Sequence, residues 1–219
     1  MLIGVTGRAQ HGKDSLGRML VEGWGFERYA FADTLKSMAL ALDPIVLLTK
    51  DEMDEIDVKK STWRLSEFVW LVEWDQAKKA AEVRRFLQAL GTEGVRDHIG
   101  EDAWVQAVEQ QLVRKGLVKY AYFPAEGSLV DDAHVVVTDV RFPNEAAWVQ
   151  RMGGKLLRVK RVAWGPYGEE PSPYDNGLGA DHPSEKFVDD LPADHELVAE
   201  NLTELRKSLE FVMRRMVRE

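Results

Sequence analysis

Residues 1–15 read MLIGVTGRAQHGKDS, and the class of fold is inferred first from these residues. Met1 to Thr6 is a short apolar run, which is typical of a buried strand in a parallel sheet. Gly7 to Lys13 then matches the pattern G-x-x-x-x-G-K, in which the loop between a strand and a helix binds phosphate. Glycines let successive backbone N–H groups turn toward phosphate oxygens, and the helix N-terminus adds a favourable dipole. The opening of the chain therefore predicts a phosphate-binding loop on an α/β fold.

The residues of this loop are expected to have different roles. Lys13 offers a positive charge to the terminal phosphates from an exposed loop-to-helix junction, and His11 is expected to be a backbone-positioning or an exposed residue rather than a catalytic one. Asp14 stands where the pattern has Ser or Thr. A carboxylate there repels phosphate unless it points away or a Mg²⁺ ion lies between, so Ser15 is the alternative hydroxyl ligand. The residues assigned to the loop site are Gly7, Arg8, Ala9, His11, Gly12, Lys13, Asp14 and Ser15.

Strand and helix patterns alternate along the rest of the chain, which indicates a mostly parallel sheet. Further strands are expected at 28–31, 134–137, 155–162 and 196–199. Helices are expected at 13–22, 33–42, 65–91, 102–115, 144–152 and 202–217, with Asp33 as a cap and Gly23 and Gly91 as stops. Three stretches are less regular: a solvated loop or short helix at 50–64, a hairpin or excursion at 116–133, and an ordered loop or lid at 163–194.

Composition excludes several classes of protein. The chain has 219 residues and a formal net charge of −8, so sequence-independent nucleic-acid binding is not expected. It has no Cys, which excludes disulfides, thiolate metal sites and Cys nucleophiles and fits a reducing cytosol. No basic leader and no long apolar run is seen, so neither a signal peptide nor a membrane span is expected. We expect a cytoplasmic protein without nucleic-acid or membrane partners.

A second acid follows the strand expected at 134–137. Asp139 comes after an apolar run, as does the acid that faces Mg²⁺ in phosphate-loop enzymes. Arg141 lies two residues further on and could reach the same phosphates, although a surface position for it stays open. Asp139 and Ser15 are the expected metal ligands, and Lys13, Asp139 and Arg141 the expected catalytic residues.

A set of cationic and amide side chains follows in the middle of the chain. Arg84 and Gln88 are four residues apart, so they share a helix face, and Thr92 and Arg96 come soon after. Arginine forks bind a phosphate and an amide reads a base edge, so the set suits a nucleoside monophosphate. Arg and Gln are also common on exposed helix faces, and periodicity alone favours the interpretation that these are ordinary surface residues.

The sequence resembles the phage-type deoxynucleoside monophosphate kinases, within the nucleoside monophosphate kinase group of P-loop kinases. The matching stretches follow the family's order along nearly the whole chain; they are IGVTGRAQHGKDS at the start, FADTLK at 31–36, RRFLQALGTEGVRDHIGEDAW at 84–104, TDVRFPNEA at 138–146 and DHPSE at 181–185. The Lys13–Asp14 pair is itself typical of that family. Residues 50–75 and 116–133 match nothing in it that we can use.

The resemblance implies a three-layer α/β/α fold, with 1–219 as a single kinase domain. It implies a helical acceptor-binding insertion at about 33–115 and a lid at about 161–190. ATP would be the phosphoryl donor, used with Mg²⁺. The implied acceptor site holds Asp33, Lys36, Arg84, Gln88, Thr92, Arg96, Arg161, His182 and Glu185. The cytoplasm would be the host's if the chain is phage-encoded, and a homodimer stays open.

The expected reaction transfers the γ-phosphoryl group of ATP to a deoxynucleoside 5′-monophosphate and so supplies DNA precursors. One alternative is a phosphate-loop kinase for another small molecule, of dephospho-coenzyme A or phosphomevalonate type, or for a hydroxyl acceptor with Asp33 as base. Another alternative is a nucleotide-binding regulatory or assembly protein without turnover. The sequence leaves the preferred base open, including a modified pyrimidine.

Overall fold

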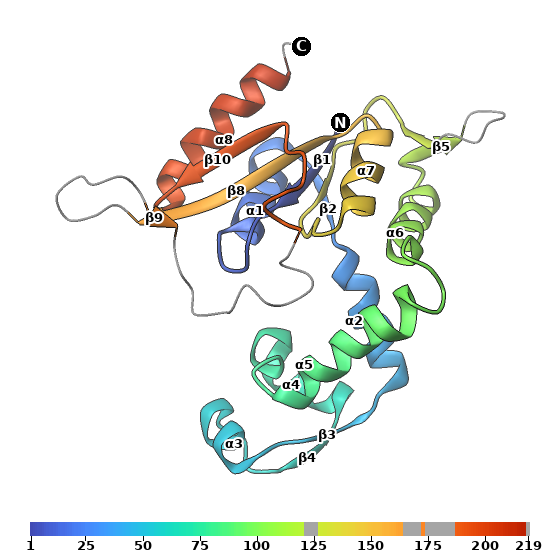
Figure 1. The fold of residues 1–219 in the computed structure, drawn as a ribbon, viewed down its shortest axis with the longest axis vertical. Coiled ribbons are helices and arrows are strands. Elements are labelled where there is room, and N and C mark those ends of the chain that lie inside the picture. Colours follow the sequence, from blue (N-terminus) through green and yellow to red (C-terminus); the bar gives the residue numbers. More distant parts are fainter. Residues whose placement is uncertain (121–126, 164–171, 174–186, 218–219) are drawn as a thin grey trace. The chain divides into compact units, whose positions relative to one another are not determined.

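The computed structural model describes residues 1–120, 127–163, 172–173 and 187–217 (Figure 1). The chain divides into two compact units. Unit 1 comprises Met1–Phe31 and Val108–Glu219, and unit 2 comprises the stretch between them, Ala32–Ala107. Each unit has a core of its own and is described by itself.

Unit 1 is built on a parallel sheet in the order β10-β8-β1-β7-β2. Its strands are β1 (Leu2–Thr6), β2 (Glu27–Tyr29), β7 (Val135–Val137), β8 (Lys155–Ala163) and β10 (His195–Ala199). A short strand, β9 (Ser172–Pro173), pairs with β8 in the antiparallel sense. The predicted α/β fold with a mostly parallel sheet is therefore confirmed, and β1, which carries the loop motif, lies in the middle.

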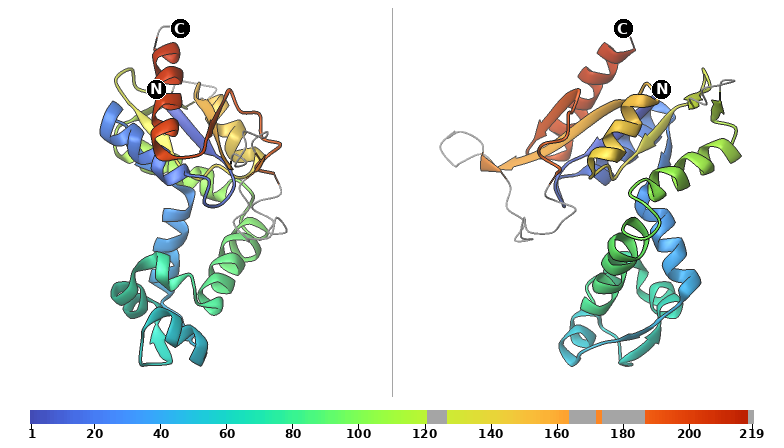
Figure 2. Two further views of the ribbon diagram at one scale, coloured as in Figure 1. Left: turned by 90° about the vertical axis from the view of Figure 1, so that its left-hand side faces the viewer. Right: turned by 45° about the vertical axis from the view of Figure 1, so that its right-hand side comes forward.

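Helices cover both faces of this sheet (Figures 1 and 2). Helices α1 (Lys13–Trp24) and α8 (Leu202–Met216) pack on one face, where Leu16 and Leu209 join strand residues such as Val5 in one buried cluster. Helix α7 (Pro143–Arg151) lies on the other face. It approaches β1 closely because Gly4 has no side chain, and a Cβ there would lie 3.0 Å from Val149 Cγ2. The sheet thus forms the middle of three layers.

Helix α6 (Ala103–Arg114) begins in unit 2 and ends in unit 1, where a hairpin follows it. The hairpin consists of β5 (Val118–Tyr120) and β6 (Gly127–Leu129), which settles 116–133 as the hairpin alternative. Glu109 of α6 accepts hydrogen bonds from Tyr120 Oη at 2.8 Å and from Trp148 Nε1 at 3.1 Å. This one carboxylate therefore joins α6 to the hairpin and to α7.

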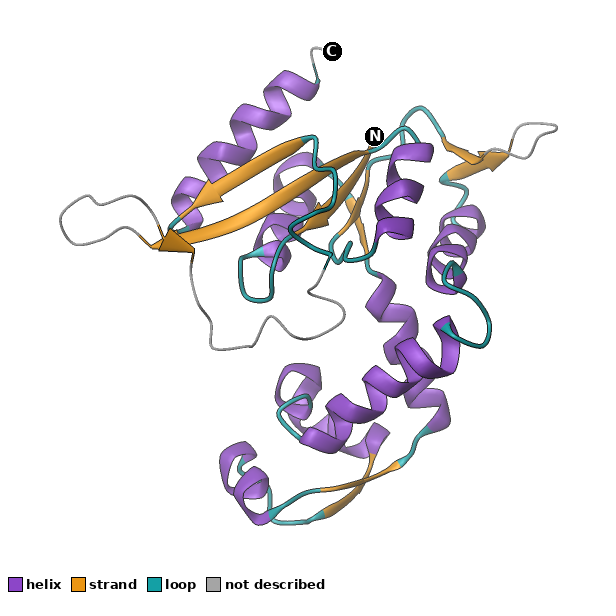
Figure 3. Ribbon diagram, in the orientation of Figure 1, coloured by secondary structure: helices purple, strands orange, loops and turns teal. Residues whose placement is uncertain are grey.

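Unit 2 is mainly helical, with one pair of antiparallel strands (Figure 3). In chain order its elements are α2 (Phe31–Leu42), β3 (Ile45–Leu47), α3 (Lys50–Ile56), β4 (Thr62–Arg64), α4 (Leu65–Ala77), α5 (Ala81–Gln88) and the π-helix η1 (Ala89–Arg96). Leu65, Phe68 and Val83 are among the buried residues of its core. The short helix expected within 50–64 is present as α3, and β4 in the same stretch was not expected.

The prediction of a single helix over 65–91 is wrong. Glu73 has a φ of 63°, outside the helical region, and Ala80 is extended between α4 and α5. A new helix starts there because Glu52 Oε1 accepts a hydrogen bond from Ala81 N at 2.7 Å and so satisfies the first turn of α5. Gly91 does not stop the helix either, since the chain continues through it as η1 to Arg96.

Three smaller expectations also need correction. Gly23 lies inside α1, and the stop is Gly25, whose φ is 71° and whose N–H bonds to the last helical carbonyls. Strand β2 ends at Tyr29 rather than at 31, because α2 already begins at Phe31. Asp33 lies in the first turn of α2 instead of capping it. Across the described ranges, no helix is both long enough and apolar enough to cross a membrane.

Candidate active site

The phosphate-loop motif follows β1 at the carboxyl edge of the sheet, where ligands of open α/β sheets bind. Its backbone needs three left-handed or related conformations, at Gly7 (φ 147°), Gln10 (φ 61°) and Gly12 (φ 101°). A Cβ at position 7 would lie 2.5 Å from the carbonyl oxygen of Val159 on β8. Glycine is required there because no side chain fits between the loop and the neighbouring strand.

Lys13 is enclosed by the loop. Its side-chain ammonium donates hydrogen bonds to Gly7 O at 2.6 Å and to Arg8 O at 2.8 Å, and the residue is 8% exposed. The expectation that Lys13 lies at an exposed junction is therefore wrong. The loop carbonyls surround its ammonium group and accept its hydrogen bonds. The positive charge is held at the Gly7–Arg8 end of the loop.

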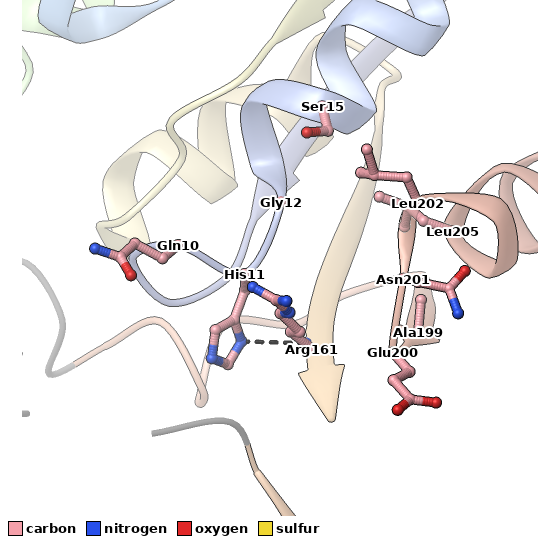
Figure 4. Close-up of a pocket in the computed structure, with 10 residues that line it drawn as sticks. All are labelled: Gln10, His11, Gly12, Ser15, Arg161, Ala199, Glu200, Asn201, Leu202 and Leu205. Carbon is pink, nitrogen blue, oxygen red and sulfur yellow. Dashed lines mark hydrogen bonds between the residues drawn. The ribbon is translucent and has the colours of Figure 1, made fainter. Parts of the chain in front are cut away.

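The loop is tied to its surroundings by two further side chains. His11 is buried, and its Nδ1 accepts a hydrogen bond from the backbone N–H of Arg161 on β8 at 3.4 Å (Figure 4). Of the two expectations for His11, an exposed position is therefore wrong, and the contact suits a backbone-positioning role. Arg8 donates to Asp189 Oδ2 from Nε at 2.9 Å and from Nη2 at 2.5 Å. No local pattern indicated this second contact, since the partners are far apart in the chain.

A pocket of about 300 Å³ lies beside the loop (Figure 4). One wall is the loop and the first turn of α1, with Ser15, and the other runs from Ala199 at the end of β10 through the β10–α8 connection to the start of α8. The residues lining it are Gln10, His11, Gly12, Ser15, Arg161, Ala199, Glu200, Asn201, Leu202 and Leu205. A concave surface that mixes apolar side chains with a few polar groups suits a small organic ligand.

The residues from the β10–α8 connection were missed by sequence reasoning. Asn201 caps α8, and its Oδ1 accepts from Thr203 N at 3.0 Å and from Glu204 N at 3.1 Å. The Asn-Leu-Thr-Glu order was a readable sign of a helix start, but nothing local indicated that this start faces the loop. Of the two candidates after Lys13, Ser15 lines the pocket and Asp14 is exposed.

Asp139 and Arg141 follow β7, which pairs directly with β1. Asp139 Oδ1 accepts a hydrogen bond from Phe31 N at 2.8 Å and so satisfies the start of α2. Arg141 donates its backbone N–H to Glu145 Oε2, also at 2.8 Å. The sheet thus brings the expected acid to the edge that carries the loop.

The donor atoms at this edge fit Mg²⁺. Ser15 and Asp139 offer oxygen ligands, which a hard cation prefers, and Mg²⁺ commonly binds through one carboxylate with phosphate and water. The part of the chain that the structure describes holds no group of three or more His, Asp or Glu side chains placed for a metal.

The remaining predicted site residues described here belong to unit 2, except Arg161. Asp33 and Lys36 lie one turn apart on α2, with Nζ 3.9 Å from Oδ1, and Lys36 Nζ is 5.8 Å from the ring centroid of Trp74. Arg84 and Gln88 are both exposed on α5, one turn apart as predicted. Arg84 Nη1 donates to the carbonyl oxygen of Lys78 at 3.2 Å.

Thr92 and Arg96 lie on η1, a helix type that sequence reasoning did not predict. Its wide turn is visible in the bond from Asp97 N to Thr92 O at 3.1 Å, which spans five residues. Such π-helical turns are rare and are found often at functional sites. The predicted site residues His182 and Glu185 lie outside the described residues, as does most of the expected lid.

The sheet and the loop define an α/β protein that carries a phosphate-loop motif. No family model matches the chain. A protein of Acanthamoeba polyphaga mimivirus named "Putative deoxynucleotide monophosphate kinase" is 26% identical over 163 residues, which cover 74% of each chain. The name of this viral relative supports a kinase, that is, a phosphotransferase.

Two solved structures resemble the chain over most of its length. One is TT1252 from Thermus thermophilus, with 18% identity, a TM-score of 0.39 and coverage of 98% of this chain and 97% of that one. The other is described as a "putative kinase" from Chloroflexus aurantiacus, with 10% identity, a TM-score of 0.35 and coverage of 97% and 95%.

Proposed function

We propose that the protein transfers the γ-phosphoryl group of ATP to deoxynucleoside 5′-monophosphates, giving diphosphates and ADP, and so supplies DNA precursors. The observation that carries the proposal is the enclosed ammonium of Lys13, held by the loop carbonyls at the carboxyl end of β1. A cation in that place meets the β- and γ-phosphates of a nucleotide. The viral relative's name supports the choice of acceptor.

The donor nucleotide would lie along the loop. Its terminal phosphates would meet Lys13, and its nucleoside would enter the pocket between Ser15 and the β10–α8 connection. We assign Arg161 to this donor side, because it lines that pocket together with the loop. When bound, Mg²⁺ would neutralise phosphate charge. Ser15 and Asp139 would hold the ion, and Arg141 would add a positive charge near the transferred group.

The acceptor would use unit 2. Arg84 and Arg96 would bind its phosphate, Gln88 and Thr92 would contact the base or sugar, and Asp33 and Lys36 on α2, and His182 and Glu185, would complete the site. A phosphate monoester has a second pKa near 6, so it is already a nucleophile at pH 7 and needs no general base. The protein's own work is then to align two phosphates, neutralise their charge and exclude water. In this proposal 1–219 is one kinase domain with an acceptor-binding insertion.

A panel of deoxynucleoside monophosphates, including 5-substituted pyrimidines, tests the proposal with ATP and Mg²⁺. We expect Arg84→Ala to raise KM for every monophosphate alike, because it removes a phosphate contact. Gln88→Ala should instead change the ranking among bases. Arg85→Ala is the matched control, since Arg85 lies on the same helix and pairs with Glu82 at 3.5 Å.

Two results would count against this assignment. If no monophosphate is phosphorylated, the acceptor class is wrong. If Arg84→Ala and Gln88→Ala both weaken ATP binding and spare the acceptor, α5 serves the donor instead.

A further inference from the structure

Asp189 lies against the phosphate loop, and none of the roles assigned so far uses it. Both Nε and Nη2 of Arg8 donate to one of its oxygens, Oδ2, at 2.9 and 2.5 Å. The hydrogen bond from Arg8 lowers the pKa of Asp189 below its usual value, and the charges of Arg8, Arg158 and Lys160 lower it further. Asp189 is therefore ionised at neutral pH and holds one edge of the Arg8 guanidinium.

The segment that carries Asp189 is seated on the rest of unit 1. Val188 is fully buried, and Leu191 is 4% exposed. The carbonyl oxygen of Leu191 accepts a hydrogen bond from Arg158 Nη2. The ring of Phe187 lies 6.1 Å from that of Phe142, in the turn that also holds Arg141. Asp189 is thus presented from a fixed position between the loop and the turn after β7.

Arg8 belongs to the terminal-phosphate end of the loop. The Lys13 ammonium, the group that meets the β- and γ-phosphates in such loops, lies against Gly7 O and Arg8 O. The pocket that suits the nucleoside is lined instead by Gln10, His11, Gly12 and Ser15. A long cationic side chain at position 8 therefore starts beside the place where a γ-phosphate would lie.

We propose that Asp189 is a positioning residue that holds Arg8 toward the terminal phosphate of the donor. The inference rests on the proposed function only in taking a nucleoside triphosphate as donor. Arginines stabilise the charge of transferred phosphoryl groups in many phosphotransferases. An arginine that is already oriented loses less side-chain freedom when the nucleotide binds. Arg8 would thus distinguish a triphosphate from a diphosphate, and Asp189 would act through it.

The test is a double-mutant cycle read by calorimetric titration with Mg²⁺–ADP and with the non-hydrolysable triphosphate analogue AMP-PNP. We expect Arg8→Ala and Asp189→Asn each to weaken AMP-PNP binding about tenfold and ADP binding less than about threefold. The double variant should be no weaker than Arg8→Ala, because Asp189 acts through Arg8. Asp189→Glu should recover part of the loss. Asp190→Asn is the matched control, since it removes the same charge from the exposed neighbouring position.

Equal losses of binding affinity for AMP-PNP and ADP would mean that Asp189 supports the loop in general, and would overturn the inference. Losses that add in the double variant would overturn it too, because the two residues would then act independently. Wild-type protein that binds neither nucleotide would contradict both the inference and the proposed function. Selective loss of AMP-PNP binding in a protein that phosphorylates no monophosphate would contradict the acceptor proposal alone.

Discussion

At the scale of single residues, the enclosed Lys13 gives the sharpest prediction. Lys13→Ala should lower the transfer rate by about 10²–10³, as expected for losing a charge contact in the transition state. It also leaves the Gly7 and Arg8 carbonyls without their donor, so the free energy of unfolding should fall by about 1–3 kcal/mol. Steady-state rates and urea unfolding measure the two effects. Near-normal turnover in a folded Lys13→Ala protein would contradict the phosphate-loop assignment.

Asp139 combines a structural contact with an expected metal contact, and two substitutions separate them. Asp139→Asn keeps a side-chain oxygen that can accept from Phe31 N, whereas Asp139→Ala removes it. We expect both variants to catalyse phosphoryl transfer slowly. High Mg²⁺ should partly rescue Asp139→Asn, because mass action restores the occupancy of the metal site. Only Asp139→Ala should lower the thermal midpoint clearly. The opposite result would be a rate that rises with pH in wild type but not in Asp139→Asn, with no rescue of that variant by Mg²⁺. Asp139 would then act as a base for a hydroxyl acceptor.

At the scale of elements, two glycines of α1 make a matched pair. A Cβ at Gly17 would lie 2.4 Å from Thr138 Cγ2, whereas nothing lies within 4 Å of one at Gly23. Gly17→Ala should therefore destabilise the protein by about 1–3 kcal/mol through overpacking. Gly23→Ala should stabilise it by up to about 1 kcal/mol through helix propensity. Thr138→Ser, which removes the methyl group, should rescue Gly17→Ala, and denaturant midpoints check all three.

Glu52 joins two helices of unit 2, and its contribution to the free energy of unfolding should depend on pH. Its Oε2 accepts from Thr49 N at 2.9 Å at the start of α3, and its Oε1 accepts from Ala81 N at the start of α5. The hydrogen bond from Ala81 is the main cause that lowers the pKa of Glu52. A lowered folded-state pKa means that the stabilisation is present above the unfolded value, near 4.3, and is lost as pH falls through the folded value.

Glu52→Gln should therefore unfold more easily than wild type at pH 7. The difference in free energy of unfolding should shrink below about pH 4. Urea unfolding at several pH values measures this difference, and Glu55→Gln on the same helix is the control. A difference that persists unchanged at pH 3 would show that Glu52 acts through packing rather than through its charge.

The elements that sequence predicts well are those with local signals. The apolar run of β1, the glycines of the loop and the β-branched run of β7 each specify their structure within a few residues. The break between α4 and α5 had no such signal, because it depends on a carboxylate of Glu52 from another helix. Asp189 was missed for the same reason, since its partner Arg8 lies at the far end of the chain. Contacts between distant segments carry no pattern in one sequence.

At the scale of the whole molecule, the net charge of −8 is opposed by a cationic cluster around the loop. The cluster consists of Arg8 and Lys13 on the loop and of Arg158, Lys160 and Arg161 on β8, and Asp189 and Glu196 pair with three of these five cations. A small anion can use such a cluster, while a long polyanion also meets the acidic remainder of the surface. We expect a 20-nucleotide DNA strand in excess to leave ADP affinity unchanged at about 0.15 M salt. Competition by the strand would contradict the expected absence of nucleic-acid partners.

The insertion of unit 2 into unit 1 also bears on the order in which the chain acquires structure. Strand β7 pairs with both β1 and β2 and lies between them, yet Ala32–Ala107 is synthesised before it. The N-terminal strands therefore leave the ribosome without the neighbour that joins them. Unit 2 is one continuous stretch and can fold during translation, at about 5–20 residues per second. The phosphate loop, although it comes first in the sequence, can be completed only after β8 and the segment carrying Asp189 have emerged.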